Sequence, residues 1–311
     1  MNLEEQQTMK RGRVGVYQRY RRRLCLPFLT PAAVLYLTFF VYPGLRALYF
    51  SLFDWSGFTQ DKKFIGLGNF RELLRDSLFW LTTERSVIVI FIGGALLFFF
   101  SFLFAMFISN GIKFGKTFKN IIFFPVVVPP VAITTLWGFI YNSNWGLLNS
   151  ILKTIGLGFL ARAWTDINHI FGSMLVMIVW ANIGFYLVIL LSAIRKIPSE
   201  YFEVAKVEGA GMWSTLTRVT IPMIWDVVAV AVVYWGIAGL KMFELIFSFT
   251  GFLPKQSIWT LPVYTYIIGF GKIDPVYRLG YSTALATLLF FFVMAFVLIG
   301  RKLMNRESVE Y

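Results

Sequence analysis

The chain has 311 residues, of which 58% are hydrophobic and only 14% are charged, and it contains 34 Phe and 10 Trp. A soluble domain normally carries about 25% charged residues and could not hide this much apolar surface, which argues against a cytosolic enzyme. The formal net charge of +13 comes from basic residues between long apolar runs. This pattern is typical of membrane topology signals rather than of nucleic-acid binding.

Apolar runs bounded by charged residues predict six membrane-spanning helices, because about 20 apolar residues cross about 30 Å of hydrocarbon. The runs are 24–45, 86–112, 120–152, 167–194, 222–249 and 279–300. The first is too long for a signal peptide and no small-x-small cleavage site follows it. A seventh run, 256–271, is too short to cross, and we expect it to form an external loop segment.

The third run contains signals that interrupt a regular helix. Pro125, Pro129 and Pro130 remove backbone donors, and such breaks are tolerated where neighbours or water satisfy the backbone, often along a transport pathway. The polar segment 142–144 is expected to end the helix early. The sequence therefore predicts a broken third span.

The distribution of basic residues predicts the topology. The two tails and the loops after spans two and four carry 17 Lys and Arg, whereas the other three loops carry 8. The positive-inside rule then places both termini in the cytoplasm. We expect an all-α polytopic membrane protein with a cytoplasmic basic tail (1–23), a six-helix transmembrane permease domain (24–300) and a cytoplasmic tail (301–311).

The cytoplasmic loop 195–222, between spans four and five, predicts a short helix. Pro198 ends the preceding helix, Ser199 can cap a new one, and Glu200 stands in the first turn, where the helix dipole favours negative charge. Gly209 and Gly211 end it after about nine residues. Because a helix this short is unstable alone in water, it needs a surface to dock against.

One face of this helix suits a protein partner. Tyr201, Val204, Ala205 and Glu208 share that face at helical spacing. Small residues would let another backbone approach closely; they are Ala205, Gly209, Ala210 and Gly211. The alternative is a helix lying on lipid, but three Glu against one Lys do not fit that composition.

A spaced motif runs through this loop: Glu203-Val204-Ala205, then Gly209, then nine residues, then Val219-Thr220-Ile221-Pro222. It resembles the Glu-Ala-Ala, Gly, Ile-x-Leu-Pro hallmark of the membrane subunits of bacterial binding-protein-dependent ABC importers, with apolar residues replacing apolar ones. Residues 64–70 and 280–284 resemble flanking segments of the maltose-type sugar permeases. Residues 243–254 resemble a third such segment, in which a Gly-Gly-Pro is degraded.

The resemblance implies a sugar-transport permease in the cell membrane, coupled to a separate cytoplasmic ATPase subunit. The coupling residues it implies are Glu200, Glu203, Val204, Ala205, Glu208, Gly209, Ala210, Gly211 and Pro222. The implied partners are the ATPase, a second and different permease subunit, an extracellular solute-binding protein and the lipid bilayer. ATP and Mg would be used by the ATPase, and no cofactor is expected on this chain.

Segment 110–117 resembles a phosphate-binding Gly-x4-Gly-Lys-Thr loop, but its first position is Asn110. It also lies between two spans without a parallel sheet, so we interpret it as a cationic cytoplasmic turn. The single Cys25 and single His169 provide neither a disulfide framework nor a metal cluster. We therefore expect that the chain is not an enzyme.

Depth along spans four and five selects candidate substrate-binding residues. Asn182 lies near the centre of span four and Tyr186 one turn further, whereas Tyr234 and Trp235 lie near the centre of span five. An amide at this depth is costly unless paired or wet, and amides with aromatic faces suit a sugar. The alternative interpretation is a helix–helix hydrogen bond with aromatic packing.

Two charged residues near the outer end of span five are further candidates. Lys241 lies seven residues beyond Tyr234 and thus on the same helix face, and Glu244, three residues on, can neutralise it. The alternative is snorkelling to the membrane interface.

Two other functions remain to be weighed against ABC import. An ion-gradient-driven secondary carrier would need acids in mid-span and internal repeats, but Asp226 and Glu244 lie near span ends. A membrane-embedded enzyme would need a His/Asp/Glu constellation, which the sequence lacks.

Overall fold

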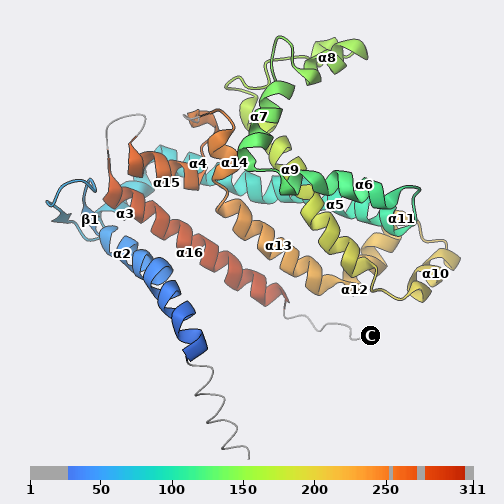
Figure 1. Ribbon diagram of the computed structural model, residues 1–311, viewed down its shortest axis with the longest axis horizontal. Helices are drawn as coiled ribbons and strands as arrows, with labels where there is room; N and C mark the ends of the chain where they lie inside the picture. The colour runs from blue at the N-terminus through green and yellow to red at the C-terminus, as the bar shows by residue number, and fades with distance from the viewer. Residues whose placement is uncertain (1–26, 252–254, 272–276, 305–311) are drawn as a thin grey trace, which may run out of the picture.

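The computed structural model describes residues 27–251, 255–271 and 277–304 (Figure 1). The predicted tail 1–23, Cys25 and residues 305–311 of the predicted tail 301–311 lie outside this part of the chain, whereas residues 301–304 continue the last helix. The described fold is helical except for one small antiparallel pair, β1 (Phe53–Asp54) with β2 (Lys63–Phe64). In Figure 1, α10 and α11 lie at one end of the helical bundle, and β1, α3 and α15 lie at the other.

Four helices are long and apolar enough to cross a membrane within the described residues. The first, Pro27–Phe50, contains the π-helical turn η1 (Leu37–Val41) and ends with α2 (Tyr42–Phe50). The second, Ser77–Ser109, joins α4 (Ser77–Ile88), the π-helical turn η2 (Val89–Gly93) and α5 (Gly94–Ser109). The others are α9 (Ile170–Ile194) and α16 (Leu279–Met304).

Two further pairs of segments are sharply bent. Segments α6 (Gly115–Phe123) and η3 (Phe124–Val127) meet α7 (Pro130–Ile140) at 108°. Segments α11 (Met212–Thr215), η5 (Leu216–Thr220) and α12 (Ile221–Met223) meet α13 (Trp225–Leu240) at 87°. Counting each pair as one span raises the four candidates to six.

The first bend has the cause that the sequence predicts. Val128 precedes a proline and adopts an extended backbone with ψ 133°, because proline disfavours the helical conformation of the residue before it. Pro129 and Pro130 then supply no backbone N–H. Helix α7 ends at Ile140, directly before the polar segment 142–144.

The remaining elements are short. They are α3 (Gly68–Arg75), α8 (Leu147–Thr154), η4 (Gly158–Leu160), α10 (Ser199–Val207), α14 (Glu244–Ser248), η6 (Gln256–Ile258) and α15 (Leu261–Phe270). The expectation that 256–271 is a loop segment is wrong, because α15 is a helix with Leu261 and Tyr264 in the core. It is too short to span a membrane, but it packs against α4 and α16.

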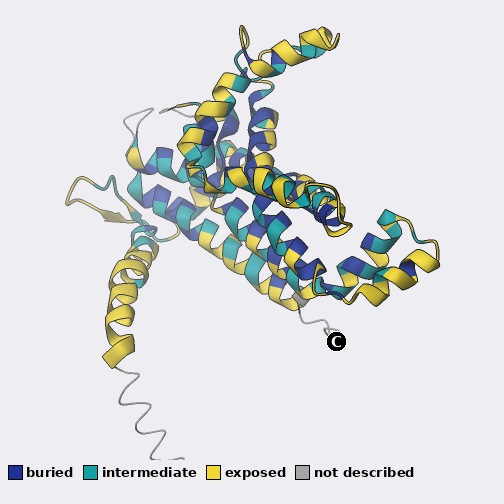
Figure 2. Ribbon diagram, turned by 45° about the vertical axis from the view of Figure 1, so that its right-hand side comes forward, coloured by how far each residue is buried: buried dark blue, intermediate teal, exposed yellow. Residues whose placement is uncertain are grey.

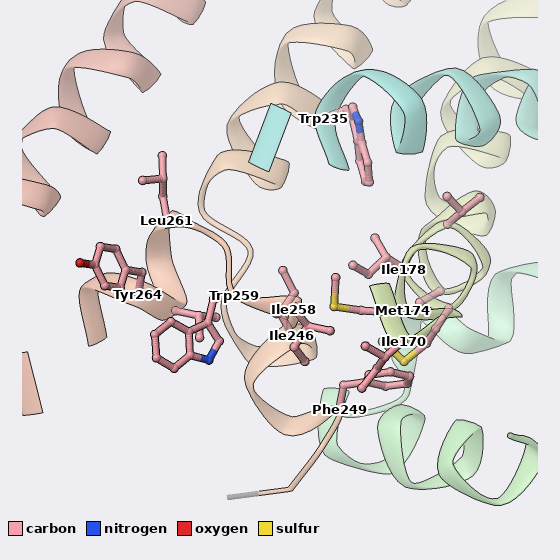
Figure 3. Close-up of a cluster of buried hydrophobic side chains, with 14 of the residues drawn as sticks. Ile170, Met174, Ile178, Trp235, Ile246, Phe249, Ile258, Trp259, Leu261 and Tyr264 are labelled. Carbon is pink, nitrogen blue, oxygen red and sulfur yellow. The ribbon is translucent and has the colours of Figure 1, made fainter. Parts of the chain in front are cut away.

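The core is centred on α9 and its neighbours. Figure 3 shows Ile170, Met174 and Ile178 of α9 beside Ile246 and Ile258. These side chains come from segments far apart in the sequence, so their packing joins α9 to α14 and η6.

Trp235 connects α13 to the second span through a hydrogen bond. Its Nε1 donates to the carbonyl of Ile90, 2.9 Å away, within the π-helical turn η2. A Cβ at Gly94 would lie 2.6 Å from Nε1, so only glycine allows this approach. Trp235 is therefore a fixed structural residue, only 2% exposed.

Polar contacts hold together the end of the bundle opposite α10. Asp76 Oδ1 accepts from the Leu78 N–H at 2.8 Å and caps α4, while Oδ2 accepts from the hydroxyls of Tyr281 and Tyr264. Beside them Arg278 donates two hydrogen bonds to Glu72, at 2.6 and 2.7 Å. These contacts join α3, α4, α15 and the start of α16.

The hydrogen bonds from Arg278 lower the pKa of Glu72 below its ordinary value of 4.5. The pair therefore stabilises the fold above that pH and loses its effect as pH falls through the folded-state pKa. Because the pair is largely exposed, we expect Glu72→Gln to lower the free energy of unfolding by only about 0.5 kcal/mol at pH 7. Thermal unfolding in detergent at a series of pH values below 7 measures this, and a deficit that does not shrink as the pH falls would contradict the assignment.

Candidate functional site

The helix predicted in the loop 195–222 is α10, which covers Ser199–Val207. Its first turn differs in detail from the prediction. Pro198, with an extended ψ of 139°, occupies the N-cap position, so Ser199 already lies inside the first turn and its hydroxyl makes no capping hydrogen bond. Glu200 stands in the first turn as expected.

The other end of α10 is closed by a glycine-dependent cap. The Ala210 N–H donates to the Ala205 carbonyl at 2.9 Å, and the Gly209 N–H donates to the Lys206 carbonyl at 3.1 Å. This pair of hydrogen bonds requires a left-handed backbone conformation at position 209, and Gly209 has φ +72°. Gly211 instead has φ −71° and begins α11, so the two glycines have different roles.

A hollow of about 750 Å³ lies beside α10. It is lined by Glu200, Tyr201, Val204, Ala205, Glu208, Gly209, Ala210, Gly211, Ser214, Arg218 and Val219. The structure thus brings together all the predicted coupling residues except Glu203 and Pro222, which are exposed beside it. A cap, an α10 face and the start of the next helix together form one concave surface.

The lining of the hollow is mixed in character. Ala205 is buried, whereas Tyr201 and Val204 are 45% and 61% exposed, so the predicted common face is divided between the body of the protein and solvent. A Cβ at Gly209 or Gly211 would meet nothing within 4 Å. The hollow is therefore open at its small residues and can accept side chains from another surface.

Helix α10 is anchored to the bundle by apolar contacts. Phe202 packs against a buried cluster that includes Ile194 at the end of α9, Ile197 in the connecting turn and Leu216 of η5. A displacement of α10 would therefore act on α9 and on η5 through packed side chains. Figure 2 shows buried residues in the interior of the helical bundle and exposed residues at its periphery, and α10 is exposed except at half-buried Phe202 and buried Ala205.

The mid-bundle aromatic candidates do meet. The Tyr186 ring centroid lies 5.9 Å from that of Trp235 and 6.4 Å from that of Tyr234. Tyr186 and Trp235 are buried, whereas Tyr234 is 54% exposed. Asn182 donates from Nδ2 to the Ile178 carbonyl of its own helix at 2.8 Å.

Phe185 is a neighbour that the sequence analysis missed. Its ring lies 5.4 Å from that of Tyr234, centroid to centroid, in a tilted arrangement. Its position three residues after Asn182 was the available signal, because residues three apart are neighbours on a helix. Tyr234 and Phe185 thus offer aromatic surface, whereas the faces of Tyr186 and Trp235 are taken up by packing.

Lys241 and Glu244 lie differently from the prediction. Helix α13 ends at Leu240, so Lys241 is its C-cap and Glu244 begins α14. The expected continuation of one helix face from Tyr234 to these residues is therefore wrong, and the two are not within ion-pair distance of each other. Both line a cavity of about 300 Å³, together with Pro130 at the start of α7.

Of segment 110–117, residues 110–114 form a turn between α5 and α6, with φ +79° at Gly111 and +62° at Phe114, and residues 115–117 begin α6. The described strands are only β1 and β2, so no parallel sheet accompanies the turn. Within the residues that the structure describes, no three His, Cys, Asp or Glu side chains gather as metal ligands.

Residues 97–307 match the family of the binding-protein-dependent transport system inner membrane component, and the chain belongs to this family. It is 32% identical to the probable ABC transporter permease protein YurN of Bacillus subtilis, over 91% of this chain and 96% of that protein. It is 30% identical to the diacetylchitobiose uptake system permease protein NgcF of Streptomyces coelicolor, over 85% and 77% of the two chains.

The fold has a counterpart among solved structures. A chain of a bacterial ABC transporter involved in the import of the acidic polysaccharide alginate superposes with a TM-score of 0.77 and 22% identity, covering 94% of this chain and 99% of that chain. The chain is thus a membrane permease subunit whose ATP hydrolysis resides in a separate subunit. Membership of this family argues against the two alternative functions, the ion-gradient-driven carrier and the membrane-embedded enzyme.

The cap of α10 generates a prediction with a matched control. Gly209→Ala places a Cβ on a left-handed residue at a cost of about 1 kcal/mol, although the space there is open. Gly211→Ala meets the same open space at an ordinary φ and should be neutral. We expect amide exchange across α10, measured by mass spectrometry, to rise about fivefold in the first variant only; an equal rise in both would contradict the cap.

Proposed function

We propose that this permease subunit forms part of the translocation path for a sugar or oligosaccharide, delivered by an external binding protein. The observation that carries the coupling is the hollow beside α10, lined by the residues of the spaced motif. The sugar assignment is supported by relatives named for the transport of trehalose and maltose, lactose and α-glucosides. The second permease subunit is proposed to be a different chain, and no cofactor is proposed on this one.

The proposed topology has six spans and both termini in the cytoplasm, with α10 on the cytoplasmic side. Its support is the excess of Lys and Arg in the tails and in the loops that include 195–222. The domain boundaries proposed from the sequence, 24 and 300, enclose five of the six candidate spans and all but the last two residues of the sixth, Leu279–Lys302. In this orientation α15, α3 and β1 face the outside.

The ATPase subunit is proposed to dock in the hollow. Glu200 and Glu208 on its rim would attract basic side chains, and Glu203 beside it would pair with another. Pro222 lies in α12, the last turn of the segment that bends into α13, and would so pass motion of the loop to the fifth span. ATP-driven closure of two ATPase subunits would then move α10 and switch the access of the path.

The substrate path is proposed to run along Tyr234 and Phe185. Their adjoining rings provide an aromatic surface for a sugar ring, and Asn182 lies on the same helix as Phe185. Lys241 and Glu244 line the nearby cavity and would donate and accept hydrogen bonds with hydroxyl groups. Tyr186 and Trp235 would support this surface from behind, because both are buried.

Filling the hollow tests the docking. Gly211→Phe puts a ring into the open space, so we expect co-purification of the ATPase subunit and ATP-driven uptake to fall at least tenfold. Thr217→Phe adds the same ring to an exposed residue of the same loop that does not line the hollow, and should leave both near the wild-type level. Normal binding of the ATPase subunit by a correctly inserted Gly211→Phe permease would contradict the docking proposal.

Removing the aromatic surface tests the path. Tyr234→Ala should lower substrate uptake in proteoliposomes about tenfold, equivalent to about 1.4 kcal/mol, without loss of ATPase association. Val232→Ala shortens another exposed side chain of α13, 41% exposed, and should have little effect. Equal uptake by the two variants would exclude Tyr234 from substrate contact.

A further inference from the structure

The segment 142–165 between α7 and α9 projects from the bundle and carries α8 (Figure 1). One side of α8 is fixed to the protein through Asn149, which is 5% exposed. Its Nδ2 donates to the Arg162 carbonyl at 3.0 Å, and its Oδ1 accepts from Trp164 Nε1 at 2.8 Å. The orientation of α8 is therefore set by buried hydrogen bonds.

The remaining surface of α8 divides into two sectors. At about 100° per residue, Leu147 and Ile151, with Ile155 just after the helix, form one row. These three side chains are 58%, 48% and 60% exposed. The polar residues Ser150, Lys153 and Thr154 are also exposed and occupy the adjoining sector. The helix thus has a protein side, an apolar side and a polar side.

The apolar side continues onto a membrane-spanning segment. Trp145, 60% exposed, packs its ring 5.8 Å from that of Phe139 of α7, centroid to centroid. Phe139 and Leu136 of α7 are themselves 56% and 46% exposed, within a candidate bent span. Exposed apolar side chains therefore run from α7, by way of Trp145, toward the apolar side of α8.

The charged residues of the segment also indicate that α8 lies near a lipid surface. In the segment 141–169 that joins α7 to α9, the charged residues are Lys153, Arg162 and Asp166. The two on or beside α8 are basic, whereas Asp166 lies just before α9 and accepts a hydrogen bond from the His169 N–H. An apolar face with aromatic residues at its edge and basic residues outside it is the composition of helices that lie at a lipid surface. Basic side chains there are attracted to anionic headgroups.

We propose that α8 lies in the membrane interface at the α9 N-terminal end of the bundle, with Leu147, Ile151 and Ile155 in the boundary between headgroups and acyl chains. The helix then sets the depth of α7 in the bilayer. A soluble partner would require these apolar side chains to face water before it binds, which folded surfaces rarely sustain.

Site-directed spin labelling of the full chain in nanodiscs of phosphatidylethanolamine and phosphatidylglycerol tests the proposal. Labels are placed at Ile151→Cys and, on the polar side of α8, at Ser150→Cys, which lies about 100° from position 151 around the helix, both with Cys25→Ser. Collisions with oxygen, which concentrates in lipid, are compared with collisions with a water-soluble nickel chelate. We expect the oxygen-to-nickel accessibility ratio at position 151 to exceed that at 150 at least threefold.

Two results would overturn the proposal. Equal ratios at the two positions would place the apolar side in water. A label at 151 that is water-accessible alone and becomes protected when the binding protein is added would identify a docking surface for that protein instead. Both readouts are independent of transport, so they separate this inference from the proposed sugar path.

Discussion

A membrane-spanning backbone must satisfy its own hydrogen bonds, and departures from a regular helix persist only where protein or a cavity compensates for them. In this protein three of the departures, the turn η2, the break before Pro130 and the end of α13 at Lys241, lie at the aromatic junction or line one cavity. The π-helical turn η2 presents the Ile90 carbonyl to Trp235. The break before Pro130 and the turn at Lys241 line the same cavity of about 300 Å³. Two interrupted spans therefore open toward one place, as in transport proteins whose sites lie at broken helices.

The same constraint connects the two ends of the mechanism. At one end Phe202 of α10 packs on the cluster that includes Ile194, the last residue of α9. Further along α9, Gly184 allows α6 of the broken third span to come so close that a Cβ there would lie 2.4 Å from the Ile122 carbonyl. Near that level Tyr186 meets Tyr234. Helix α9 thus contacts three parts of the protein: the apolar cluster that anchors α10, the broken third span and the aromatic surface at Tyr234.

The sequence predicts most where a local rule decides the structure. Pro198 and Gly209 delimit α10 because each imposes a backbone conformation, and Pro129 breaks the third span for the same reason. It fails where tertiary packing decides. Helix α15 is buried because α4 and α16 cover it, and α13 ends at Leu240, directly before Lys241, although the sequence predicts that this span continues to residue 249. The hollow itself depends on how the loop 195–222 folds back on α10, and the spacing of the motif residues in the sequence does not predict this.

Packing also divides the candidate path residues into two kinds. Trp235 is only 2% exposed and its indole N–H already donates to the Ile90 carbonyl, so it could reach a passing substrate only by giving up this buried hydrogen bond. Tyr234 directly precedes Trp235 on the same helix, and its side chain is half exposed rather than buried in the core. Two adjacent aromatic residues that look alike in sequence are therefore unequal: one fixes the distance between α13 and η2, and the other remains free to contact a ligand.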